Sequence, residues 1–87
     1  MKLEKLRTRI NEADYKIVQL VARRQSYMPE VAVIKRKEKI AIFQPEREVS
    51  VLASKKVLAK KFGVSERLIE SIFRLILKDS RRIQRKS

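Results

Sequence analysis

The sequence contains neither cysteine nor histidine. Without cysteine there are no disulfides or thiol nucleophiles, and without histidine there is no imidazole acid–base chemistry; zinc sites lose both of their usual ligands. A metal site would consist of carboxylates alone, and the acidic residues show no such cluster, so we expect neither a metal nor a cofactor. Any chemistry must therefore use fixed charges and hydrogen bonds.

Glycine occurs once and proline twice, and alternating apolar and polar runs are brief, which favours an all-helical fold. We expect residues 1–87 to form a single domain. A core of this size gives only marginal stability, so we also expect an oligomer. The longest apolar runs, 31–34 and 40–43, are too short to span a membrane, and no signal-peptide pattern begins the sequence. These features predict a soluble, cytoplasmic protein without a membrane partner.

Basic residues outnumber acidic ones by 23 to 10, a formal net charge of +13. Such a charge attracts polyanions and speeds the arrival of small anions. The basic runs, including the tail at 81–86, most simply form solvated helix faces. A basic helical module for nucleic acid is the alternative from another class, but aromatic residues are few and no recognition-helix motif is present. We expect nucleic acid to bind only non-specifically.

Apolar residues return at alternating steps of three and four through residues 3–35, the pattern of one stripe along a long helix. Arg24 stands at a position where the stripe calls for an apolar residue. A charge in a core costs several kcal/mol unless an anion meets it. This helix is therefore predicted to hold an anion.

Three helices account for the chain. The first is expected to span about residues 2–39, with a kink rather than a break at Pro29 because the stripe keeps its register beyond it. Pro45 suits the first position of a second helix, which closes at Gly63, a residue that favours the left-handed conformation. Ser65 is a good N-cap for the third helix, which runs almost to the end of the sequence.

Cationic and polar residues recur on these helices. Arg24 and Lys35 are eleven residues apart, so they lie within about 20° around the first helix and about 16 Å along it, a gap suited to a small anion. Arg7 lies some 25 Å from Arg24, but an antiparallel second copy can bring its own Arg7 alongside. Ser80 and Gln84 are one turn apart on the third helix. With no obvious nucleophile or acid–base pair, the set suits a small, multiply charged anion. The set comprises Arg7, Arg24, Lys35, Arg47, Ser80 and Gln84.

Five short motifs follow one another in a specific order and spacing. They are Leu6-Arg7-x-x-Ile10-x-x-x-Asp14, Leu20-x-x-x-Arg24, Val31-x-x-x-Lys35, Pro45-Glu46-Arg47-Glu48 and Phe73-x-x-Ile76-x-x-x-Ser80-x-x-x-Gln84. Each motif is weak alone. Together, over nearly the whole chain, they resemble the all-helical, AroQ-type chorismate mutases.

The resemblance implies an intertwined homodimer, in which three helices from each chain build two active sites and each site receives an arginine from the other chain. Arg24 and Arg7 of the partner subunit would bind the carboxylates of chorismate, a small dianion. Arg47 would support them, and Ser80 would line the carboxylate end.

The resemblance also assigns the reacting end of the site. Lys35 and Gln84 would face the ether oxygen whose bond breaks, and Glu48 would take the ring hydroxyl. Gln44 stands where many members have aspartate, and we count it among the substrate-binding residues. The residues implied to be catalytic are Lys35, Gln84, Arg24 and Glu48.

The implied activity is an intramolecular isomerisation, the Claisen rearrangement of chorismate to prephenate in the shikimate pathway to phenylalanine and tyrosine. It needs no proton transfer and no covalent intermediate, and fixed cations suit the task of folding a dianion and stabilising its developing charge. Tyr27, Met28, Pro29 and Arg81 depart from the residues usual in the family. They leave open the related isochorismate-pyruvate lyases, which share the fold and the cationic site.

Overall fold

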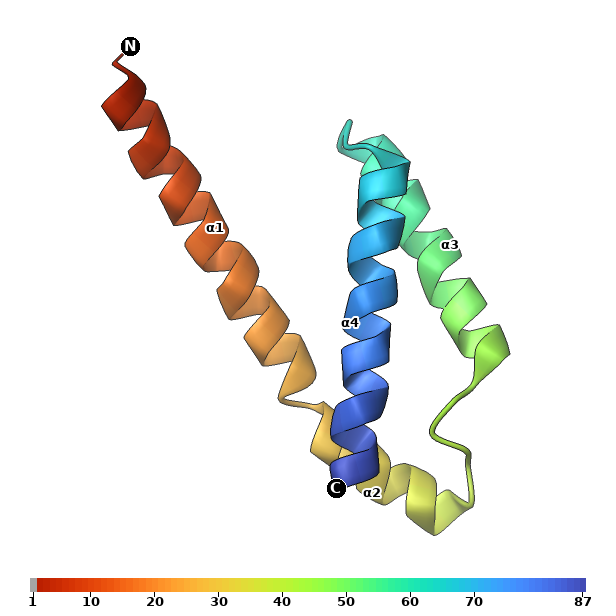
Figure 1. The fold of residues 1–87 in the computed structure, drawn as a ribbon. Helices are drawn as coiled ribbons and strands as arrows, with labels where there is room; N and C mark the ends of the chain where they lie inside the picture. The colour runs from red at the N-terminus through yellow and green to blue at the C-terminus, as the bar shows by residue number, and fades with distance from the viewer. Residues whose placement is uncertain (1) are drawn as a thin grey trace.

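The computed structural model describes residues 2–87, which form helices without any strand. α3 and α4 make an antiparallel hairpin, α2 crosses near the C-terminal end of α4, and α1 extends away from the hairpin (Figure 1). Within residues 2–87 no helix is both long and apolar enough to cross a membrane. The all-helical prediction is confirmed. The helices are α1 (Leu3–Gln25), α2 (Met28–Glu38), α3 (Pro45–Lys61) and α4 (Glu66–Lys86).

The first helix is broken rather than kinked, so the expected continuous helix is wrong at this point. α1 ends at Gln25, the amide of Tyr27 bonds to the carbonyl oxygen of Arg24 at 3.3 Å, and α2 begins at Met28. Pro29 has no amide to offer the Gln25 carbonyl, and its ring crowds that turn, which accounts for the interruption. With α1 and α2 taken as two arms of one segment, the predicted order of three helical segments holds.

The predicted helix starts are confirmed. Pro45 opens α3, where its missing amide has no partner to lose, and Glu46 and Glu48 lie in the first turn, near the positive end of the helix. The Ser65 hydroxyl caps α4 by accepting a hydrogen bond from the amide of Leu68 at 3.1 Å. These two residues fix where each helix of the hairpin begins.

α2 and α3 end with the same left-handed turn. After α3, Gly63 has φ +68°, and the amide of Val64 donates to the carbonyl oxygen of Ala59 at 2.8 Å. After α2, Lys39 has φ +58°, and the next amide donates to the carbonyl oxygen of Lys35 at 2.8 Å. The glycine was predicted. The lysine adopts a conformation that costs a residue with a Cβ about 1 kcal/mol.

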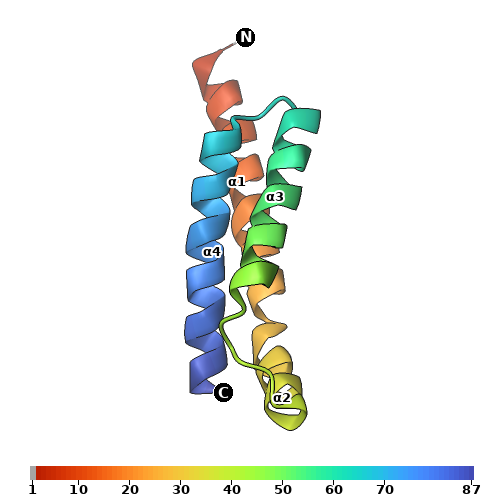
Figure 2. The ribbon, with the colours of Figure 1, turned by 90° about the vertical axis from the view of Figure 1, so that its right-hand side faces the viewer.

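The apolar core is small and lies between α3 and α4. Val51, Leu52 and Leu77 form one buried cluster, with Phe73 packed against it. Among residues 2–87, α4 contacts all three other helices. It packs along α3 (Figure 2), crosses α2 and meets the end of α1.

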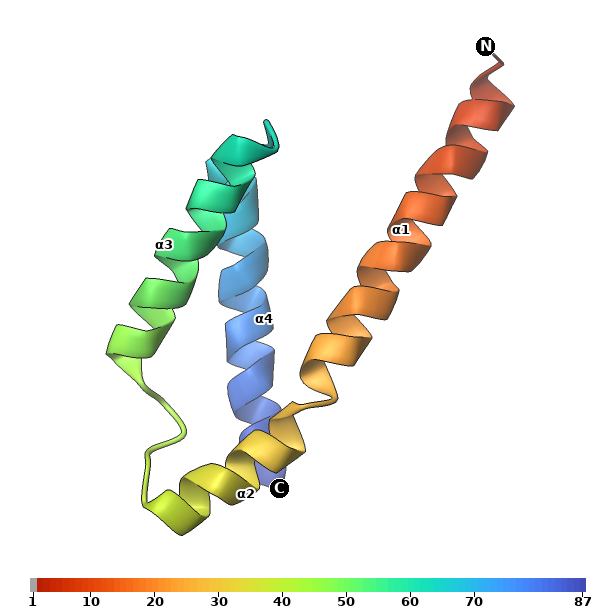
Figure 3. The same ribbon diagram turned by 180° about the vertical axis from the view of Figure 1, so that it is seen from behind.

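α1 projects from the rest of the chain, and most of its length has no neighbour there (Figure 3). Its apolar stripe is accordingly bare: Leu3 is 59% exposed, Ile10 56% and Leu20 60%. The radius of gyration is 16.0 Å, whereas a compact domain of this length has about 12 Å. The stripe predicted from the sequence thus exists, but nothing within residues 2–87 covers it.

Candidate active site

A cavity of about 230 Å³ lies where the end of α1 meets α2, α3 and α4. Four cationic side chains and one carboxylate contribute to its wall, together with apolar side chains from each helical segment. A partly enclosed site with this excess of positive charge attracts a small anion. Seven of the eight predicted site residues line it: Arg24, Lys35, Gln44, Arg47, Glu48, Ser80 and Gln84.

Arg24 lies in the last turn of α1, and α4 holds its guanidinium in place. Nη1 donates to Ser80 Oγ at 2.7 Å and to Gln25 Oε1 at 2.7 Å. Gln25 is in turn fixed by donating to the carbonyl oxygen of Ile76 at 3.2 Å and to Asp79 Oδ2 at 3.1 Å. No group among the described residues accepts from Nε or Nη2 of Arg24, so these donors remain for a ligand.

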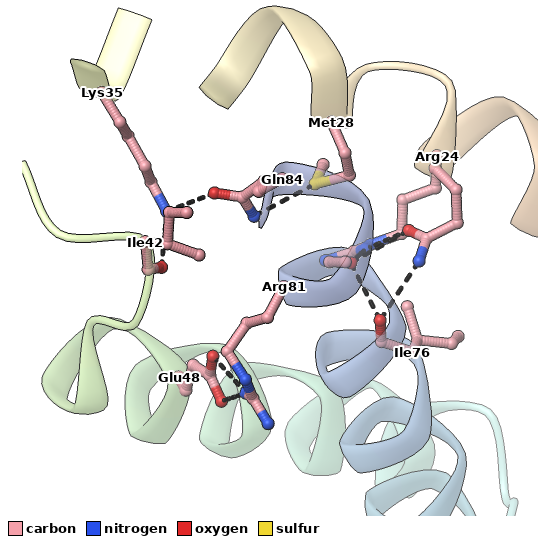
Figure 4. A network of polar contacts seen from close by, with 10 residues as sticks. Arg24, Met28, Lys35, Ile42, Glu48, Ile76, Arg81 and Gln84 are labelled. Carbon is pink, nitrogen blue, oxygen red and sulfur yellow. Dashed lines mark hydrogen bonds and ion pairs between the residues drawn. The ribbon is translucent and has the colours of Figure 1, made fainter. Parts of the chain in front are cut away.

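Lys35 on α2 reaches the opposite part of the cavity (Figure 4). Its ammonium donates to the carbonyl oxygen of Ile42 at 2.9 Å and to Gln84 Oε1 at 2.8 Å. Because that oxygen is occupied, the Gln84 amide presents Nε2, which lies 3.7 Å from Met28 Sδ. An ammonium has three donors and a primary amide has two, so Lys35 and Gln84 each keep one N–H for a ligand.

Glu48 is the one carboxylate in the cavity wall, and Arg81 from α4 holds it. Arg81 Nη1 bonds to both carboxylate oxygens, at 2.5 Å for Oε2. The same guanidinium lies over the Phe43 ring, 5.1 Å from its centroid. The side chains of Arg81 and Glu48 are only 21% and 19% exposed, so water screens this pair less than it screens a surface pair.

Two cations of the cavity, Arg24 and Lys35, have lowered pKa values. Burial lowers the pKa of Arg24, and the nearby charge of Arg47 lowers it further. Burial also lowers the pKa of Lys35; Glu48 opposes that change by raising it, and Arg47 adds to it. An anion bound among such like charges stabilises their protonated forms.

Arg7 is the predicted site residue that the single chain does not bring to the cavity. It lies exposed on the projecting part of α1, outside the cavity wall. Its predicted contribution from a second chain stays a prediction.

Three polar contacts of the site were not predicted from the sequence. Gln25 and Asp79 brace Arg24, and Arg81, noted there only as a departure from the family, holds Glu48. Gln25 follows Arg24 directly at the break before Pro29, so recognising a break would have pointed to it. The Glu48–Arg81 pair joins residues 33 positions apart and has no local signal.

Comparisons with known proteins identify the family of the chain. A family model described as chorismate mutase type II matches residues 6–85. The chain is 34% identical over 84 residues to the chorismate mutase of Methanocaldococcus jannaschii, covering 97% of this chain and 85% of that protein. It is 33% identical over 78 residues to the T-protein of Haemophilus influenzae, covering 90% of this chain and 21% of that protein.

A third relative is the bifunctional chorismate mutase/prephenate dehydratase of Buchnera aphidicola, 35% identical over 80 residues. The chain spans about a fifth of the length of this protein and of the T-protein. No solved structure gives a significant match. Since the family model covers almost the whole sequence and one relative of similar length is 34% identical, the chain belongs to the chorismate mutase type II family.

Proposed function

We propose that the chain is a chorismate mutase, which converts chorismate to prephenate for the synthesis of aromatic amino acids. The observation that carries the proposal is one cavity in which Arg24 and Lys35, from separate helices, both keep hydrogen-bond donors that the protein does not use. A dianion of chorismate's size matches this charge, and family membership supports the choice of substrate.

The carboxylates of chorismate would bind at the Arg24 end. The guanidinium is held by Ser80 and Gln25 through Nη1 alone, which leaves its remaining edge for charge-assisted bonds to a carboxylate. Arg47 adds a second cation to the same wall. Holding both ends of the substrate in a folded form removes much of the entropic cost of the cyclic transition state.

The breaking bond would lie at the Lys35 end. In the rearrangement the ether C–O bond breaks as a new C–C bond forms, and negative charge develops on the ether oxygen. Lys35 Nζ donates to Gln84 Oε1 at 2.8 Å, and the free N–H of Gln84 is on Nε2 of the same amide group. The two free donors therefore lie close together, and we expect both to reach one substrate oxygen. Preorganised donors of this kind stabilise a transition state more than a ground state.

We further propose that the site is completed in a homodimer, with Arg7 of the partner subunit joining Arg24. The exposed apolar stripe of α1 supports this assembly, because its residues have no packing surface in their own chain. An antiparallel second α1 would cover the stripe and carry its own Arg7 toward the cavity.

Purified protein tests the proposal directly. Loss of chorismate absorbance with formation of prephenate is the expected result, and pyruvate release from isochorismate without prephenate formation would assign the lyase activity instead. Consumption of neither compound at high enzyme concentration would overturn the proposal.

A further inference from the structure

Lys35 and Glu48 carry opposite charges in the same cavity wall, and Glu48 raises the pKa of Lys35, so the two charges act on each other. Yet among residues 2–87 no ion pair joins them. The Lys35 ammonium bonds to neutral oxygens of Ile42 and Gln84, and the carboxylate bonds to Arg81. Opposite charges in a partly enclosed cavity attract strongly, so something must keep the Lys35 ammonium and the Glu48 carboxylate apart.

Arg81 supplies that cause. Its Nη1 bonds to both oxygens of Glu48, while the face of the guanidinium lies over Phe43, in the connection between α2 and α3. Figure 4 shows Arg81 descending from α4 to the carboxylate on α3, away from the Lys35 ammonium. A carboxylate has about four acceptor positions and Arg81 occupies two, so Glu48 can still accept a ligand's hydroxyl.

We infer that Arg81 is a positioning residue that holds Glu48 away from Lys35 and so keeps the Lys35 ammonium free for the substrate. Without Arg81 the carboxylate is released and turns toward Lys35, a cavity cation on which its charge already acts. The paired ammonium then stabilises the breaking ether bond less well, because its charge is already compensated. This inference rests on the proposed function for its catalytic consequence, but not for the contact between the charges.

The first test is kinetic. Arg81→Met should lower kcat about tenfold with a smaller change in KM, since the loss concerns transition-state stabilisation. The matched control is Arg85→Met, the same change one turn further along the exposed side of α4, which should stay within about twofold of wild type. Equal activity of the two variants would overturn the inference.

A double-mutant cycle identifies the route of the effect. If Arg81 acts through the carboxylate, Arg81→Met should cost less than about twofold when introduced into Glu48→Gln protein. A tenfold loss in that background as well would mean that Arg81 acts independently of Glu48, contrary to the inference. Thermal unfolding of each variant distinguishes these losses from a failure to fold.

A third test does not depend on the activity. The pKa of Lys35 can be measured by NMR in substrate-free protein with labelled lysine side chains, and it reports the interaction between Lys35 and Glu48. The charged groups around this ammonium in the cavity are Arg24 on α1, Arg47 and Glu48 on α3, and Arg81 on α4. Arg81→Met should raise the pKa of Lys35 through the freed carboxylate, and the rise should be much smaller in the Glu48→Gln background. An unchanged Lys35 pKa in Arg81→Met would refute the inference; inactive wild-type protein would refute only the proposed function.

Discussion

The two ends of α1 differ in every respect that matters to the site. At the C-terminal end, Arg24 and Gln25 form a network of hydrogen bonds with α4. Within residues 2–87 no buried side-chain polar atom lacks a hydrogen-bond partner. At the N-terminal end, Leu3 and Ile10 are more than half exposed. One chain therefore assembles the polar part of its site but leaves the supporting helix without a packing surface.

The exposed stripe is energetically large. Complete burial of an exposed Leu or Ile side chain stabilises by about 1.5–3 kcal/mol. The five of the stripe in α1 are 42–60% exposed, so covering them is worth on the order of 5 kcal/mol. That is comparable with the entire stability of a typical small domain. A second chain is thus the more economical explanation for the projecting helix than an unsupported monomer. The five are Leu3, Leu6, Ile10, Ile17 and Leu20.

The largest expected effect is on activity, when the Arg7 of one chain or the Arg24 of the other is removed from a shared site. Arg7→Ala and Arg24→Ala are each expected to be nearly inactive, because each removes a carboxylate ligand from both sites of a dimer. After mixing and subunit exchange, a mixed dimer has one site with both defects and one intact site. Activity should recover to roughly a quarter of wild type at equal mixing, since half of the dimers are mixed.

Exchange must be verified separately, for example by mass spectrometry of differently labelled chains. Full exchange without any recovery of activity would contradict the shared site. The cavity would then have to work within a single chain, and the exposed end of α1 would have no role in catalysis.

Lys35→Ala tests the cavity end alone. Loss of a preorganised donor at the breaking bond should lower kcat by about 10² or more. Lys37→Ala, an exposed lysine two residues further along α2, should have little effect. Steady-state kinetics on chorismate distinguishes the two, and similar losses in both variants would show that general positive charge, rather than the placed ammonium, is what matters.

Gln25→Leu tests whether the brace on Arg24 matters. The substitution keeps the size of the side chain but removes its bonds to Arg24, Ile76 and Asp79. The guanidinium then keeps only its bond to Ser80 and is held less firmly. We expect about a tenfold fall in kcat/KM, mostly through KM. Gln19→Leu, on the exposed part of α1, is the control. An equal fall in kcat/KM for Gln19→Leu would show that the hydrogen bonds of Gln25 have no specific role in activity.

The pH dependence of activity tests the charge state of Lys35. Because burial and Arg47 lower the pKa of Lys35, activity should decline with rising pH below the ordinary titration range of lysine. Glu48 raises that pKa, so Glu48→Gln should move the alkaline limb to lower pH. A limb that stays in place would mean that another group controls it.

The smallest effect concerns the helix end beside the cavity. Lys39 occupies the left-handed conformation that Gly63 occupies at the end of α3. Lys39→Gly should raise the free energy of unfolding by about 0.5–1 kcal/mol, measured by urea titration at fixed protein concentration. Lys37→Gly, within α2, should have the opposite sign by a similar amount.

The sequence predicted the helix boundaries where single residues decide them, as Pro45, Gly63 and Ser65 do. It did not predict the break after Gln25, because an apolar stripe can keep its register across two residues that leave the helical hydrogen-bond pattern. Nor did it predict the left-handed turn at Lys39, since no glycine marks it.

The site divides along similar lines. Arg24 and Lys35 could be proposed from the spacing along one stretch of sequence, and the cavity brings them together. The Arg81–Glu48 pair depends on how α3 packs against α4, which periodicity does not specify. The role of Arg7 in the site depends on a second chain and stays a prediction.

The projecting α1 also sets an order of events in folding. The core of the α3–α4 hairpin is formed by residues of one chain, so we expect its formation to be independent of protein concentration. The α1 stripe has no packing surface within residues 2–87, so in the proposed homodimer it is buried only when two chains associate. The last phase of refolding should therefore accelerate with protein concentration, and an early chain with its α1 still bare should be the species most prone to aggregation.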